Sequence, residues 1–345
     1  MDSDIKVTNL EYYKVGTGDC EVYLGTVKLY PLGTPQYDTQ YLTVRALSNG
    51  SVRWSGTTSG SASNTLSYST DSGATWSSPS ADVTVNVSSG DTIMWKGYCT
   101  PYSTTFGIGV FVVGALIDLE VEGNIMSLLY GDNFSGQTSL SGKDYVFSRL
   151  FTTCSKLKSS SNLVLPATTL SNGCYYGMFE GCGSLTTAPT LPATTLTYGC
   201  YEHMFFTCRA LEVAPALPAT TLAERCYDSM FNGCTSLEVA PSLPATTLAN
   251  SCYFAMFNGC VSLTTAPVLS ATTLVDGCYW VMFQGCSGLT AITCLATDIS
   301  AYICTANWVD GVAPTGVFTK DPNMTSWTID SVHGVPIGWT VQDYT

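Results

Sequence analysis

The chain has 345 residues, a hydrophobic fraction of 45%, 11% charged side chains and a formal net charge of -13. This composition supports a sizeable core rather than a disordered chain, and the acidic balance argues against phosphate recognition, so nucleic acid is not an expected partner. The two histidines, His203 and His333, stand too far apart in the sequence to suggest a histidine-based catalytic or zinc site. We therefore expect neither a metal nor another cofactor.

Neither the start of the chain nor its longest apolar stretch predicts a targeting or membrane segment. Residues 1–4 are acidic and lack the positive and apolar regions of a secretory signal. The apolar stretch 106–119 is shorter than the roughly 20 residues that a membrane-spanning helix needs. We expect no membrane insertion, and any export would have to use another route.

Residues 1–145 alternate apolar and polar side chains in short runs separated by Gly, Ser, Asn and Asp, which is typical of an all-β fold. The runs predict strands over 20–24, 41–46, 51–55, 81–87, 92–97 and 107–113. We expect an attachment or hairpin segment over 1–35, followed by a β-sandwich or barrel-like domain over 36–123.

Residues 69–76 read Ser-Thr-Asp-Ser-Gly-Ala-Thr-Trp and resemble the Asp-box of sialidases. In such a motif Asp71 and a glycine close a hairpin while Trp76 packs beneath it, so both residues are expected to be structural. A propeller enzyme would repeat the motif in each blade, and no arginine triad or acid and base pair can be identified near this single copy. The chain is therefore predicted not to be an enzyme, and no catalytic residue is assigned.

From about residue 146 the sequence repeats every 26 residues. A Leu-Pro-Ala-Thr-Thr-Leu phrase begins at Leu165, Leu191, Leu217 and Leu243, and returns with Ser in place of Pro at Leu269. Each phrase is followed by Cys-Tyr, Met-Phe and a second Cys. The β-branched phrase predicts a short strand, and the i, i+4, i+8 spacing of Cys, Met and Cys predicts a short helix with these three on one face.

The periodic positions are expected to form the core. They are the first cysteines Cys174, Cys200, Cys226, Cys252 and Cys278, the second cysteines Cys182, Cys208, Cys234, Cys260 and Cys286, and the phenylalanines Phe179, Phe205, Phe231, Phe257 and Phe283. Buried thiols, disulfides and metal sites are the three possible roles of the cysteines. Buried thiols are favoured because the two ladders are regular, the total of 15 is odd, and no Cys-x-x-Cys pair or histidine repeats with them. Cys154 begins the second ladder, so eleven cysteines belong to the two ladders, whereas Cys20, Cys99, Cys294 and Cys304 fall outside them and stay unassigned.

A strand and a helical turn in each 26-residue unit match the period of a leucine-rich-repeat solenoid, in which every coil stacks on its neighbours. We expect this solenoid over 149–293, with an N-terminal cap over 124–148 and a C-terminal cap over 294–345. The predicted fold class of the whole chain is mainly β with short helices.

One position of the predicted helix changes completely from unit to unit. It is occupied by Tyr176, Glu202, Asp228, Phe254 and Trp280. Because this position lies opposite the cysteine and methionine face, stacked units would place the five side chains in a column on the outside of the solenoid. Aromatic and carboxylate groups are typical of recognition surfaces, so the column is a candidate ligand-binding site. Packing against another subunit and simple tolerance of an exposed position are the alternatives.

The units, with their Leu-Pro-Ala-Thr-Thr-Leu, Cys-Tyr, Met-Phe, Gly-Cys and Ser-Leu elements, resemble the BspA-like leucine-rich repeats of gut bacterial surface proteins and of phage and prophage virion proteins. The similarity covers about residues 146–300, and segments 22–31 and 338–341 resemble, more weakly, modules that accompany such repeats. The resemblance implies a surface-displayed binding or structural protein and supplies no catalytic residue.

These observations predict a non-enzymatic phage virion protein of the fibre type. Its N-terminal β region would attach to other virion proteins, and its solenoid would bind a glycan or protein on the host surface. By analogy with virion fibres it is expected to be a homo-oligomer, a trimer, assembled in the host cytoplasm. A bacterial cell-surface adhesin is the alternative, and a glycan hydrolase built on the Asp-box domain is a less favoured third.

Overall fold

The computed structural model describes residues 37–55, 65–78, 83–98, 112–115, 117–325, 327–330 and 332–345, together with the backbone of three short strands nearer the N-terminus. These strands, β1 (Glu11–Tyr12), β2 (Glu21–Leu24) and β3 (Val27–Pro31), form an antiparallel sheet in that order. Most of the predicted attachment segment over 1–35 lies outside the described residues, as do Cys20 and Cys99.

The N-terminal part is built from two sheets. Its strands are β4 (Leu42–Ala46), β5 (Gly50–Ser55), β6 (Thr65–Ser69), β7 (Val83–Val87), β8 (Thr92–Tyr98), β9 (Val112–Ala115) and β10 (Leu119–Asn124). One sheet has the order β10-β4-β8-β6 and the other β7-β5-β9, and all of these pairs are antiparallel. The predicted mainly β class is confirmed, and no sheet closes into a barrel within the described residues.

The two sheets pack through buried aromatic rings. Trp54 of β5 and Trp95 of β8 are both buried, and their rings stack with centroids 4.4 Å apart. Because successive side chains of a strand point to opposite faces, alternation in β8 buries Ile93, Trp95 and Gly97 and leaves their neighbours half-buried or exposed. The large stacked indoles hold the facing sheets together.

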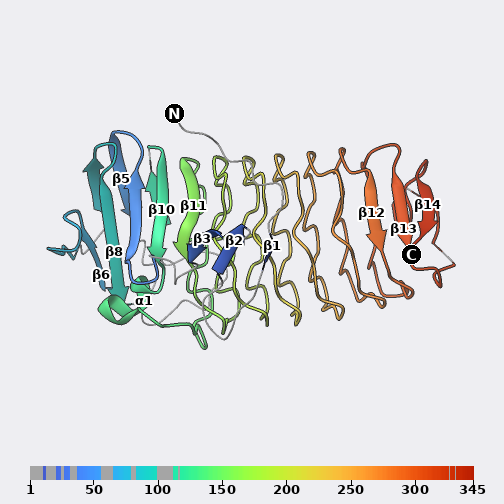
Figure 1. Ribbon diagram of the computed structural model, residues 1–345, viewed down its shortest axis with the longest axis horizontal. Coiled ribbons are helices and arrows are strands. Elements are labelled where there is room, and N and C mark those ends of the chain that lie inside the picture. Colours follow the sequence, from blue (N-terminus) through green and yellow to red (C-terminus); the bar gives the residue numbers. More distant parts are fainter. Residues whose placement is uncertain are drawn as a thin grey trace.

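The first sheet continues into the repeat region. After β10 come the chain's short α-helix α1 (Ser127–Tyr130) and the 3-10 helix η1 (Gly131–Asn133), and then β11 (Leu157–Val164) pairs in parallel with β10. At the far end β12 (Ala291–Cys294), β13 (Val317–Lys320) and β14 (Thr340–Asp343) form another parallel sheet. Figure 1 shows the intervening segments side by side along the long axis of the molecule, between β11 and β12.

Turn segments replace the predicted short helices, so that prediction is wrong. We use the name turn segments for residues 143–154, 171–182, 197–208, 223–234, 249–260, 275–286 and 301–312. Within 173–181 the φ angle is positive at every fourth residue, Gly173, Gly177 and Gly181, and this interrupts any α-helix. The only helices in the described part of the chain are α1 and η1.

The backbone of a turn segment alternates between two kinds of hydrogen bond. The amide of Met178 donates to the carbonyl of Tyr175 within the segment, at 3.2 Å. The amide of the next residue, Phe179, donates to the carbonyl of Met204 in the following segment, at 2.9 Å. The same alternation recurs along the stack, so every second amide binds a carbonyl of the following segment and ties neighbouring segments together. That carbonyl is 27 residues later for segment 143–154 and 25 residues later for the segments after it.

This stacking lines up the repeated aromatic side chains in the core. The rings of Phe179, Phe205, Phe231, Phe257 and Phe283 stack with centroids 5.4 to 5.8 Å apart. A second row contains Tyr175, Tyr201, Tyr227, Tyr253 and Tyr279, with spacings of 5.7 to 6.2 Å. All eleven ladder cysteines, Cys154 included, are buried as free thiols.

The second cysteine of each unit has a polar contact as well as an apolar environment. The thiol of Cys208 donates to the carbonyl of Phe179 at 3.1 Å, and that of Cys234 donates to the carbonyl of Phe205 at 3.2 Å. The thiols of the other units make the same contact. Cysteine suits this position because it is small and apolar, and its S–H still supplies a weak donor.

Near the C-terminus Trp327 contacts the last turn segment, which contains Trp308, and Trp339 contacts the residue that follows this segment. Trp308 stacks on Tyr279 at 6.3 Å and on Trp327 at 5.7 Å, and the indole N–H of Trp339 donates to the carbonyl of Ala313. Cys304, which falls outside the predicted ladders, follows Cys278 by 26 residues and is buried in the same row. No helix in the described ranges is long and apolar enough to cross a bilayer.

Replacing Phe231 with Ala is expected to cost about 3–5 kcal/mol of unfolding free energy, because the ring is fully buried between Phe205 and Phe257. Urea unfolding would measure the change. The control is Val239→Ala, since that side chain is 62% exposed and its truncation should change little. Equal losses in the two variants would contradict the placement of Phe231 in the core.

Candidate functional site

The column predicted to lie on the surface is only partly exposed. Tyr176, Glu202 and Asp228 are 4%, 2% and 1% exposed, so the predicted exposure is wrong for these three residues. Phe254 and Trp280 are half-buried, with ring centroids 4.9 Å apart. Tyr176 and Glu202 each contact a side chain of the next turn segment, His203 and Arg225 respectively, and these contacts reduce their exposure.

The middle of the column is a buried charge cluster, which we define as Glu202, His203, Arg225 and Asp228. One guanidinium nitrogen of Arg225, Nη2, lies 2.9 Å from Oε1 of Glu202 and 2.9 Å from Oδ2 of Asp228. Nε2 of His203 lies 4.0 Å from Oδ1 of Asp228, and that oxygen also accepts a hydrogen bond from Ser229 at 2.8 Å. The cluster therefore joins turn segments 197–208 and 223–234.

Further groups on the preceding segments surround the cluster. The hydroxyl of Tyr176 lies 3.4 Å from Nδ1 of His203, and the two rings are 5.5 Å apart. The guanidinium of Arg149 lies over the Tyr176 ring, and its Nε is 3.2 Å from a carboxylate oxygen of Glu180. Two cations and three carboxylates thus lie along one face of the turn segments.

Burial sets the protonation behaviour of the cluster. It raises the pKa of Glu202 to about 7, with the Asp228 carboxylate adding to the rise and Arg225 opposing it. It raises the pKa of Asp228 to about 6 against the opposing hydrogen bond from Ser229 and the charge of Arg225. It lowers the pKa of His203 to about 4, with Arg225 and Arg149 adding to the effect. At pH 7 the imidazole is therefore neutral and has one ring nitrogen able to act as an acceptor or ligand.

The cluster leaves two buried polar atoms without a hydrogen-bond partner among the described residues. They are Oε2 of Glu202 and Nε of Arg225. Sequence reasoning selected Glu202 and Asp228 but missed His203 and Arg225. A signal was present, because residues 26 apart become neighbours once units stack, and His203 is the only histidine of the repeats.

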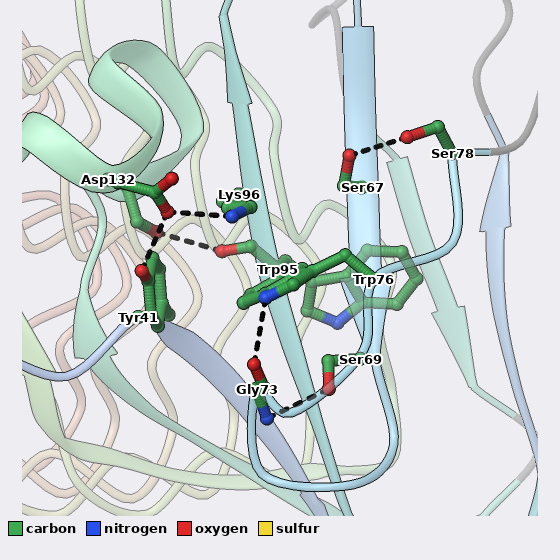
Figure 2. Close-up of polar contacts among 10 residues, drawn as sticks. Tyr41, Ser67, Ser69, Gly73, Trp76, Ser78, Trp95, Lys96 and Asp132 are labelled. Carbon is green, nitrogen blue, oxygen red and sulfur yellow. Dashed lines mark hydrogen bonds and ion pairs between the residues drawn. The ribbon is translucent and has the colours of Figure 1, made fainter.

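The Asp-box forms a second, separate cluster in the N-terminal part (Figure 2). Asp71 accepts hydrogen bonds from Ser69 and from both the amide and the hydroxyl of Thr75, and these contacts lower its pKa to about 2. The indole N–H of Trp76 donates to the carbonyl of Gly73 at 3.1 Å, and this bond closes the turn. The contacts of Asp71 and Trp76 are those of a structural motif.

Trp76 also connects the Asp-box to the helices that follow β10. The ammonium of Lys96 lies 4.1 Å from the centroid of the Trp76 ring and 2.7 Å from a carboxylate oxygen of Asp132 in η1. The hydroxyl of Tyr41 donates to that same oxygen at 2.7 Å. Figure 2 shows these side chains meeting between the sheet and the helix. Each polar group has a partner, so the cluster ties elements together rather than presenting an open reactive group.

Comparisons of the chain with protein-family models, with curated proteins and with solved structures return no match. The repeat period, the buried charge cluster and the half-buried aromatic pair Phe254 and Trp280 are therefore the observations on which a functional proposal has to rest.

Replacing Asp71 with Asn is expected to lower the Tm at pH 7, because the carboxylate accepts three hydrogen bonds in the turn. The pKa of Asp71 falls from 3.8 to about 2 in the folded protein, so its stabilisation is present above pH 4 and is lost as the pH falls through 2. Calorimetry from pH 7 to 2 should show the difference from the wild type shrinking. Exposed Glu238→Gln is the control, and a pH-independent difference would contradict this role.

Replacing Arg225 with Gln removes the cation that neutralises two buried carboxylates, and we expect a loss of about 2–3 kcal/mol of unfolding free energy. The side chain of Arg225 is 39% exposed, which places the expected cost below that of a fully buried pair. Urea unfolding would measure it beside Arg209→Gln, since Arg209 is an exposed arginine of the same repeats. Similar small effects of both substitutions would show that the cluster adds nothing to stability.

Proposed function

We propose that the 26-residue units form a leucine-rich-repeat solenoid and that the protein is a non-enzymatic phage virion protein of the fibre type, which attaches to the host surface. The backbone hydrogen bonds between turn segments support the first part, because they make each unit a neighbour of the next over a long distance. A stiff, elongated body of this kind suits the display of a binding face away from its point of attachment (Figure 1).

The proposed binding surface, which we call the aromatic end, consists of Phe254, Trp280 and Tyr302 in the last three turn segments. Phe254 and Trp280 are half-buried, and Tyr302, two residues before buried Cys304, is 73% exposed. The amide of Tyr302 donates to the carboxylate of exposed Asp276 at 3.0 Å, so a carboxylate adjoins the aromatic group. Rigid aromatic rings beside a few polar groups are suited to stacking on sugar rings or to docking on a protein.

The scarcity of basic residues in the repeats limits the classes of partner that this surface could bind. Arg209 and Arg225 are the only basic residues between 159 and 319, and Arg225 already binds two buried carboxylates. We therefore propose an uncharged glycan or a protein surface as the target rather than a polyanion. Other virion proteins are the proposed partners of the N-terminal β sheets, and assembly as a homotrimer would multiply weak single contacts on one particle.

The alternative is a bacterial cell-surface adhesin with the same binding face. It differs from the virion protein in genetic and physical location, not in binding chemistry. Tail or capsid genes beside the coding sequence would favour the virion protein, and secretion or polysaccharide-utilisation genes would favour the adhesin. Mass spectrometry of purified particles and of cell envelopes separates the two locations directly.

Binding of the full chain to intact candidate host cells tests the aromatic end. We expect the double variant Trp280→Ala and Tyr302→Ala to bind about tenfold more weakly, as is typical when central aromatic contacts are removed. Tyr344→Ala is the matched control, because Tyr344 is also exposed but lies beyond β14. Equal thermal stability of all variants is required. Undiminished binding by the double variant would reject this face, and absence of binding by the wild type would leave a structural spacer as the better proposal.

A further inference from the structure

We propose that Glu202, His203 and Asp228 form a binding site for one divalent transition-metal ion, with Zn²⁺ as the expected occupant. This goes beyond attachment and departs from the sequence-based expectation that the chain holds no metal. The site would lie between turn segments 197–208 and 223–234, on the same face as the half-buried aromatic pair.

The donor atoms are already close together. One potential ligand atom from each of Glu202, His203 and Asp228 lies within 4.8 Å of the others, the only such group in the described part of the chain. Carboxylate oxygens and an imidazole nitrogen around a metal at about 2.1 Å would need to approach by less than about 1.5 Å. The stacked backbone holds the two segments in register, so side-chain rotation alone supplies this movement.

The groups around the three residues orient them as ligands. The hydroxyl of Tyr176 contacts Nδ1 of His203, which leaves Nε2 directed toward the Asp228 carboxylate, 4.0 Å away. Ser229 fixes the other end by donating to Oδ1 of Asp228. A histidine held by a hydrogen bond at one ring nitrogen while the other faces a carboxylate is the arrangement that outer partners create at metal centres.

Glu202 provides an independent observation in favour of a ligand. Only 2% of its side chain is exposed, and its Oε2 has no hydrogen-bond partner among the described residues. An unpaired carboxylate oxygen in such a place is costly, and a cation is the partner that an ionised carboxylate binds most strongly.

Arg225 is the competing occupant. A single guanidinium nitrogen, Nη2, contacts both carboxylates, and Nε has no hydrogen-bond partner among the described residues. Arg225 therefore forms no bidentate pair, with two parallel N–H···O bonds, to either carboxylate. The side chain is 39% exposed and has a path to solvent. We infer that Arg225 moves outward when the metal binds, and that it weakens the affinity by having to be displaced.

The donor set selects the class of metal. Two carboxylates and one imidazole suit Zn²⁺ and its neighbours among the transition metals, whereas Ca²⁺ and Mg²⁺ prefer oxygen ligands alone. The metal would add one more link between adjacent segments, and a ligand bound only by the folded state raises the Tm.

The test is calorimetric titration of the chelator-treated full chain with ZnCl₂, with MgCl₂ and CaCl₂ as comparison salts. The wild type should bind one Zn²⁺ and gain Tm, and His203→Gln should abolish both effects. His333→Gln is the matched control, because the second histidine also lies beside a carboxylate, 3.9 Å from Asp330, but is exposed. Tyr176→Phe should weaken binding about tenfold by releasing the imidazole, and Arg225→Gln should tighten it by removing the competing cation.

The variants keep the outcomes distinct. Circular dichroism before titration establishes that each variant is folded, which matters most for Arg225→Gln. Absence of Zn²⁺ binding by the wild type overturns the proposal, and so does binding that survives His203→Gln, since the metal would then be held by other residues such as thiols. Weaker binding by Arg225→Gln would overturn the competition and assign the arginine a supporting role. None of these results depends on binding to host cells.

Discussion

The repeat region depends on the backbone hydrogen bonds that run between neighbouring turn segments. Every second amide donates across to the next segment, and the chain can present its amides in this way because a residue with positive φ recurs at every fourth position. Glycine adopts this conformation freely, but the stack also imposes it on Val281 and Ile303, which are β-branched. A left-handed conformation costs such residues roughly 1–2 kcal/mol each, so the hydrogen bonds and the buried core must offset that cost.

The spacing between segments then decides which side chains fit inside. Ring centroids of the phenylalanine row lie 5.4 to 5.8 Å apart, which is within the range of favourable stacking. The cysteine and methionine side chains of the turn segments are buried in the same core as these rings. The carbonyl that receives the Cys208 thiol also accepts the amide of Cys182 at 3.0 Å, so the thiol uses a second lone pair that would otherwise stay unpaired. Serine would bond more strongly there, but a buried hydroxyl costs more to desolvate.

Periodicity identifies inward-facing residues better than it identifies backbone conformation. The 26-residue period and the mainly β class follow from the sequence, and the strands predicted over 41–46, 51–55 and 92–97 overlap β4, β5 and β8. An i, i+4, i+8 pattern, however, is shared by an α-helix and by four-residue turns in succession, because both return a side chain to one face after four residues. Because of this ambiguity, the prediction of a short helix in each unit is wrong. It also produced the wrong exposure of Tyr176, Glu202 and Asp228, since the far side of an isolated helix faces solvent. Strand β6 was missed because Thr65–Ser69 has too few apolar residues to predict a strand.

The buried charge cluster is formed by residues that differ from one repeat unit to the next. The residues that all units share pack in the core between segments. A binding or reactive group that occurs only once must therefore come from the positions that vary between units. At one such position the stack brings Glu202 and Asp228 together from units 26 residues apart, and burial makes two adjacent carboxylates unfavourable without a cation. Arg225 supplies one positive charge to two carboxylates, and one carboxylate oxygen and one guanidinium nitrogen remain unpaired. An apolar pair of similar size would often be at least as stable as such a network, and the unpaired oxygen of Glu202 is consistent with the metal site proposed above.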